Sequence, residues 1–229
     1  MKFTKYIFLI FIIPIYCQFG KNIVQYKSFD WHYIQSKYFD VYFYDSDKGS
    51  TNINSNAEFV ARESLKSYDI ISNAIGWKLK NRIPIIVYNS HNDFQQTNII
   101  DMYMPEGVGG VTELYKNRVV IPFDGNNNQF KTVIHHELVH AFINDYIYKG
   151  SIQNMQNDDV ILIPLWMNEG LAEFLSTPWQ TESDMWMRDL VVNGEKLPKL
   201  NELNGYLAYR GGQSVWKYIV EELDTLYAQ

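Results

Sequence analysis

The chain has a single cysteine, Cys17, among its 229 residues. One cysteine cannot close a disulfide within the chain, and loss of the N-terminus would leave no cysteine at all. A metal site in the mature protein would therefore have no thiolate ligand and would have to use histidine and carboxylate side chains.

Positive charge is scarce and dispersed. The 20 Lys and Arg residues are outnumbered by 26 Asp and Glu, which gives a formal net charge of −6, and the basic residues form no cluster. This distribution argues against nucleic acid as a partner. Apolar residues make up 46% of the chain, which suffices for a packed core, and the length suits one domain.

Long apolar runs are absent except at the N-terminus, where two lysines precede a run from Tyr6 to Cys17. About a dozen residues are too few to span a bilayer but suit the core of a signal peptide. We expect residues 1–17 to be a cleaved signal peptide, with no stable membrane span afterwards and a protein that is secreted or held in the periplasm or cell envelope. A lipoprotein signal fits less well, because the bulky Tyr16 precedes the cysteine, and an uncleaved membrane anchor is a further alternative.

The hydrophobic pattern predicts an α+β fold, with a mixed or antiparallel sheet and one long helix followed by a mostly helical part. Residues 18–229 are expected to form one domain. We expect three β segments: a strand or hairpin over 31–45, a buried strand over 82–89, and a hairpin over 107–123 that turns near Lys116 and Asn117. Helices are expected between Ser55 and Gly76 and over 128–146, 163–176, 182–193 and 211–226.

The stretch VIHHELVHAF, Val133–Phe142, carries three of the five histidines. Positions four apart share one face of a helix, so His136 and His140 can bind one metal ion together, whereas His135 has no histidine at that spacing. Glu137 is the one acidic residue in a stretch that is otherwise apolar apart from its histidines. Burying this carboxylate requires a compensating charge such as a cation.

A second segment, WMNEGLAEF, supplies further carboxylates. Glu169 and Glu173 are four apart, so they share a helix face, and the 28 residues between His140 and Glu169 allow a return on a second helix. One of the two can be the third protein ligand of a metal. The other can accept the free N–H of a ligand histidine and so fix its tautomer. The alternative is an ordinary solvated pair of glutamates.

Together the two segments resemble the gluzincin, or thermolysin-like, metallopeptidases, and most of all the bacterial peptidase-MA-like domains with a Trp-x-x-Glu-Gly-x-Ala-Glu-aromatic signature. The resemblance covers roughly Tyr38 to Leu226. It implies a zincin-like domain with one Zn²⁺ in the cleft between its two parts, bound by His136, His140 and Glu169. Members of this kind often continue into a β-propeller, which is absent here, so the domain is either truncated at its C-terminus or naturally short.

The same resemblance implies roles for the neighbouring residues. Glu137 would be the general base, and Asn168 and Glu173 would support the ligands, with Glu173 next to His136 and Asn168 near His140. A tyrosine shortly before the last helix would assist catalysis, and Tyr209 is preferred over Tyr206.

The segment Gly110, Val111 and Thr112 is expected to be an edge strand that binds substrate. Glycines suit a place where another backbone must come close, and an extended peptide can add to an exposed sheet edge. Thermolysin-like enzymes place such a strand just before the zinc helix. The alternative is that the glycines only shape a flexible loop.

The leading hypothesis is a secreted zinc-dependent peptidase that acts on peptides or proteins. A second hypothesis is a binding or assembly module of the cell envelope that keeps the peptidase fold and metal site. The intact Glu137 argues against it, because a structural site needs ligands but no base. A zinc hydrolase that acts on a non-peptide amide is a third possibility.

Overall fold

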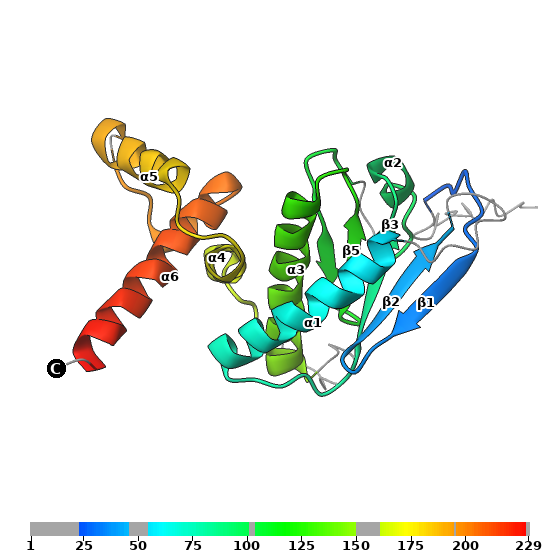
Figure 1. Cartoon of the computed structure of the whole chain (residues 1–229). Coiled ribbons are helices and arrows are strands. Elements are labelled where there is room, and N and C mark those ends of the chain that lie inside the picture. Colours follow the sequence, from blue (N-terminus) through cyan, green and yellow to red (C-terminus); the bar gives the residue numbers. More distant parts are fainter. Residues whose placement is uncertain (1–22, 46–54, 101–103, 150–160, 195, 228–229) are drawn as a thin grey trace, which may run out of the picture.

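The computed structural model describes residues 23–45, 55–100, 104–149, 161–194 and 196–227. The expected signal peptide, residues 1–17, lies outside these ranges. Figure 1 shows a sheet with two helices laid across one face, and a helical part beyond them. The expected α+β class is confirmed, and the sheet is mixed.

The sheet has five strands in the order β1-β2-β3-β5-β4. The central pairs β2–β3 and β3–β5 are parallel, while β1 and β4 pair antiparallel at the two edges. The expected strand or hairpin at 31–45 is a hairpin, and the hairpin over 107–123 is also confirmed. The strands are β1 (Trp31–Gln35), β2 (Phe39–Tyr44), β3 (Ile83–Tyr88), β4 (Val111–Glu113) and β5 (Arg118–Pro122).

The described helices follow the expected ranges closely, with two differences. A short helix, α2, follows β3 and was not expected, and α6 begins at Tyr206 rather than at Gly211. The expectation that Tyr209 would precede the last helix is therefore wrong. The helices are α1 (Ser55–Ile75), α2 (His91–Phe94), α3 (Asn127–Tyr148), α4 (Leu165–Ser176), α5 (Thr181–Asn193) and α6 (Tyr206–Tyr227), with a short 3-10 turn, η2 (Leu200–Glu202).

Two apolar clusters hold the sheet, one on each face. Successive side chains of a strand point to opposite faces, so Val119 and Ile121 of β5 pack under α1 and α3 while Val120 packs on the other side. The helix-side cluster is the larger and includes Leu138 and Phe142 of α3, both fully buried. The histidine-bearing helix is therefore fixed against the sheet along one whole face.

Helix α3 begins at a side-chain cap. Asn126 accepts hydrogen bonds from the backbone N–H groups of Asn128 and Gln129 through its side-chain oxygen, at 3.0 and 3.2 Å. Such a cap satisfies donors that the first turn of a helix leaves unpaired. The motif histidines lie in the middle of this 22-residue helix, where the backbone does not fray.

Helices α4 and α6 cross in backbone contact. A Cβ atom on Gly212 would lie 2.1 Å from the carbonyl oxygen of Trp166, and one on Gly170 would lie 2.5 Å from the Cα atom of Gly212. The indole of Trp216 donates to the carbonyl of Met167 at 3.0 Å next to the crossing. In Figure 1, α4 lies between α3 and α6, so this crossing fixes where α6 stands relative to α3.

Because the two helices touch at Gly212, we expect its substitution by alanine to lower the stability of the protein, opposite to the usual effect of Gly→Ala in a helix. In an ordinary helix interior, Gly→Ala stabilises by about 0.5–1 kcal/mol. Gly212→Ala should instead destabilise by about 1–3 kcal/mol, because the new methyl group has no space and must separate the helices. Thermal unfolding would measure this change.

Gly107→Ala is the matched control, since a Cβ at Gly107 meets nothing within 4 Å. That variant should unfold within about 0.5 kcal/mol of the parent. A Gly212→Ala protein as stable as the parent would contradict the contact.

Candidate metal centre

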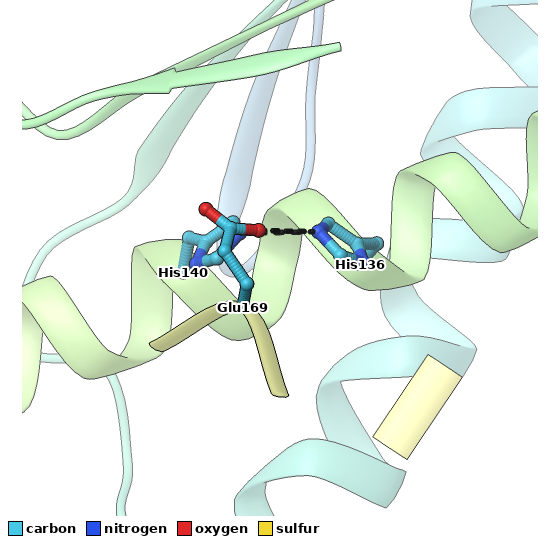
Figure 2. A group of neighbouring side chains, drawn as sticks. All are labelled: His136, His140 and Glu169. Carbon is cyan, nitrogen blue, oxygen red and sulfur yellow. Dashed lines mark hydrogen bonds and ion pairs between the residues drawn. The ribbon is translucent and has the colours of Figure 1, made fainter. Parts of the chain in front are cut away.

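Three side chains converge on one point between α3 and α4. His136 and His140 come from adjacent turns of α3, and Glu169 comes from α4 (Figure 2). Oxygen Oε2 of Glu169 lies 3.3 Å from Nε2 of each histidine, and the two Nε2 atoms are 3.2 Å apart. Among the described residues these three form a group that can hold a metal ion.

The far side of each imidazole faces an oxygen that accepts hydrogen bonds. Nδ1 of His140 lies 3.2 Å from Oδ1 of Asn168, and Nδ1 of His136 lies 3.5 Å from Oε2 of Glu173. Both contacts favour the tautomer with the proton on Nδ1, which leaves a lone pair on each Nε2. Two lone pairs directed at each other 3.2 Å apart repel unless a proton or a cation lies between them.

The triangle of donor atoms has the size that a zinc ion requires. Bond lengths of about 2.0–2.1 Å in a tetrahedral site put neighbouring ligand atoms about 3.3–3.4 Å apart. The three measured separations are 3.2, 3.3 and 3.3 Å. Two imidazole nitrogens and one carboxylate oxygen are also a donor set used by catalytic zinc sites.

The charged side chains around the three donor atoms favour positive charge at the site. Glu137, Glu169 and Glu173 contribute three carboxylates, and the guanidinium of Arg210 offsets one of them. Burial disfavours a charged His136, yet hydrogen bonds with Glu169 and Glu173 raise its pKa to about 10. Burial likewise opposes ionisation of Glu169, but its two histidine partners hold its pKa well below the usual range. The site thus stabilises positive charge at the point where the three donors meet.

Glu173 bridges a ligand histidine and an arginine. Its Oε2 faces His136, while its Oε1 accepts a hydrogen bond from Nη1 of Arg210 at 2.7 Å. Burial raises the pKa of Glu173, but His136 and Arg210 lower it further than burial raises it, so the carboxylate stays ionised. Glu173 and Arg210 are 37 positions apart in the chain, so no local spacing in the sequence indicates that they pair.

Of the two candidate tyrosines, Tyr209 lies against the metal group. Its ring stacks on that of His136, with centroids 6.0 Å apart and planes at 17°. Burial, the negative charge of Glu169 and a hydrogen bond to Glu169 all raise the pKa of Tyr209, so its hydroxyl keeps its proton. Tyr206 is 44% exposed and receives a hydrogen bond from Arg210 instead.

Glu137 lies one residue from His136 but outside the donor triangle. It is 6% exposed, and its Oε2 accepts a hydrogen bond from the hydroxyl of Thr112 on β4 at 2.7 Å. Strand β4 forms an edge of the described sheet, and Gly110 lies just before it. A Cβ on Gly110 would come within 2.9 Å of Cγ of Glu137, so glycine allows the strand to approach the glutamate closely.

The group opens onto two cavities that meet at its centre. One, of about 320 Å³, extends past His140 toward Leu114 and Asn144. The other, of about 770 Å³, extends toward Gln129 and Gly205. The residues that line both are Val108, Gly110, His136, Glu137 and Tyr209.

His135 takes no part in the group. Its Nε2 atom is buried without a hydrogen-bond partner among the described residues, and burial lowers its pKa to about 4. The i, i+4 register therefore selected the two histidines that the fold brings together.

No family model, curated protein or solved structure matches the chain. Across the described ranges, no helix is both long enough and apolar enough to cross a membrane.

The bridge through Glu173 predicts a change in metal affinity. Glu173→Ala should weaken metal binding roughly 10- to 100-fold, because His136 loses the partner that orients its ring and fixes its tautomer. Competition with a chromophoric chelator would give the dissociation constants.

Glu58→Ala is the control, because Glu58 is an exposed glutamate in the first turn of α1. Its metal affinity should equal that of the parent. Equal affinity in the Glu173→Ala protein would show that the contact with His136 has no effect on the metal.

Proposed function

We propose that the protein is a secreted zinc-dependent peptidase of the gluzincin type. The observation that carries the proposal is the donor triangle of His136, His140 and Glu169 with the carboxylate of Glu137 beside it. A site that only stabilises a fold has no need of this second acidic group, which lies outside the donor triangle. The resemblance of the two motifs to the peptidase-MA-like domains supports the same function, and the N-terminal apolar run supports secretion.

The chain's own residues would divide the chemistry between them. Bound zinc would supply a Lewis acid that polarises the scissile carbonyl and makes water acidic enough to attack at neutral pH. Glu137 would take a proton from the attacking water and pass it to the leaving amine. The hydroxyl of Tyr209, kept protonated by its surroundings, would donate a hydrogen bond to the negative charge that develops on the carbonyl oxygen.

The sheet edge would hold the substrate. An extended peptide can pair with the free side of β4, whose other side is occupied by β5. The residues of α3 that line the two cavities extend from Gln129 to Asn144. Over these positions the helix rises about 22 Å. At about 3.3 Å per residue, this length accommodates six to seven residues of extended chain. Such a cleft suits a substrate that passes through it.

A Glu137→Gln variant separates chemistry from metal binding. Glutamine keeps the shape of the side chain but cannot take a proton, so activity should fall about 100- to 10,000-fold while zinc content stays at one ion per chain. Activity would be measured on a mixed peptide pool by mass spectrometry, with and without chelator, and zinc by elemental analysis.

Two histidine variants complete this experiment. His140→Ala should lose both zinc and activity, whereas His135→Ala, the matched change one residue from His136, should keep its zinc. A parent that binds zinc but cleaves nothing would favour the binding or assembly module. Substantial turnover by Glu137→Gln would refute the role of the base.

The two-sided cleft predicts cleavage of internal bonds. The two cavities extend from the donor triangle in opposite directions, one toward Asn144 and the other toward Gln129. A peptide can therefore continue on both sides of the bond that is cut. Peptides acetylated at one end and amidated at the other should therefore be cut within about threefold of the rate of their unblocked forms. Cleavage confined to peptides with a free terminus would contradict the prediction that internal bonds are cut.

A further inference from the structure

Thr112 connects the sheet edge to the zinc helix. It is the middle residue of β4, and its side chain points to the face of the sheet that α3 covers. Its hydroxyl oxygen lies 2.7 Å from Oε2 of Glu137 and 2.9 Å from the main-chain carbonyl oxygen of the same residue. The hydroxyl has a single proton to donate, and the charged carboxylate is the closer and stronger of the two acceptors.

The carboxylate of Glu137 needs such a restraint. Glu137 follows His136 directly, and its side chain has three rotatable bonds. A carboxylate so close to a divalent cation is drawn toward it, and once coordinated to the metal it could no longer accept a proton from water. A hydrogen bond from a neutral hydroxyl holds the carboxylate aside without adding a competing charge.

Packing restrains the stem of the same side chain. A methyl group at position 110 would come within 2.9 Å of Cγ of Glu137 and 3.0 Å of Val133, so the strand already lies against the glutamate. Gly110 thus limits the stem of Glu137, and Thr112 fixes its tip. Contacts from β4 and from the residue just before it thus restrain both the stem and the tip of the Glu137 side chain.

We propose that Thr112 is a positioning residue for the general base. It binds Oε2 of Glu137, which leaves Oε1 to take the proton from water. The inference rests on the proposed peptidase function and adds that the strand proposed to bind substrate also sets the geometry of the base. A substrate that stiffens β4 then also stiffens Thr112 and the base that it holds.

Thr112→Val tests this role, since valine keeps the β-branched shape and removes the hydroxyl. A misplaced base lowers turnover rather than substrate binding, so kcat should fall roughly 10- to 100-fold with KM within about threefold of the parent. Thr112→Ser, which restores the hydroxyl, should recover kcat to within about threefold. Zinc content should be unchanged in both variants.

Thr97→Val is the control, because Thr97 is also a hydrogen-bonded threonine but lies outside the cleft residues; it is fully buried, whereas Thr112 is half-buried. It should lower the melting temperature and leave kcat at the parental value. Parental kcat in Thr112→Val, or a loss in Thr112→Ser as large as in Thr112→Val, would overturn the proposal.

Crystal structures of the parent and of Thr112→Val, with and without zinc, separate this proposal from the function on which it rests. The Glu137 carboxylate should keep its place in the parent and turn toward the metal group in the variant. The same orientation in both proteins would overturn the positioning role. A parent that cleaves no peptide would overturn the proposed function, and the Glu137 orientation would still decide the role of Thr112.

Discussion

The site depends on an excess of buried negative charge beside the middle of α3. Three carboxylates gather around two imidazoles, and one guanidinium balances only one of them. Buried negative charge of this kind is costly unless positive charge offsets it, which here can be a proton on His136 or a bound cation. A divalent ion would bring the sum to zero. This charge balance, together with the histidine motif, supports the proposal that the cluster binds a metal ion.

The geometry of the site is set by contacts outside it. Glu169 precedes Gly170, and Tyr209 lies three residues before Gly212, so the backbone contact of these two glycines places a ligand and a neighbouring hydroxyl together. The sheet does the same for the base, since β4 reaches Glu137 through Thr112. The residues of the site thus lie on helices and a strand. Two close contacts position them: the backbones of α4 and α6 at Gly170 and Gly212, and β4 against α3 at Thr112 and Glu137.

Local spacing predicted what lies within one helix. The four-residue interval selected His136 and His140 over His135, and the same interval placed Glu169 and Glu173 on one face of α4. The sequence pattern also predicted most helices and the hairpin over 107–123, and it left a strand or a hairpin open over 31–45. These features depend on residues near one another in the chain, which sequence patterns report directly.

Contacts between distant segments could not be predicted in this way. The sequence predicts a last helix over 211–226, so it places Gly211 and Gly212 at the start of that helix. In the structure Gly212 lies inside α6, where the backbone of α4 leaves no room for a side chain. The partnership of Arg210 with Glu173 follows from that crossing, so it was hidden for the same reason.

Glu173 depends on both local spacing and a distant contact. The four-residue spacing predicted its place on α4, while its partner on α6 is seen only in the structure. An aspartate on α4 would have a shorter reach, and Glu173 must serve two partners on different helices. Its contact with Arg210 at 2.7 Å is the tighter, and that with His136 at 3.5 Å is the looser. The longer side chain thus ties α6 to the ligand histidine on α3 through α4. Glu173 therefore connects the α4–α6 crossing with the ring of His136, and a metal ion bound at the proposed site would depend on the same contacts.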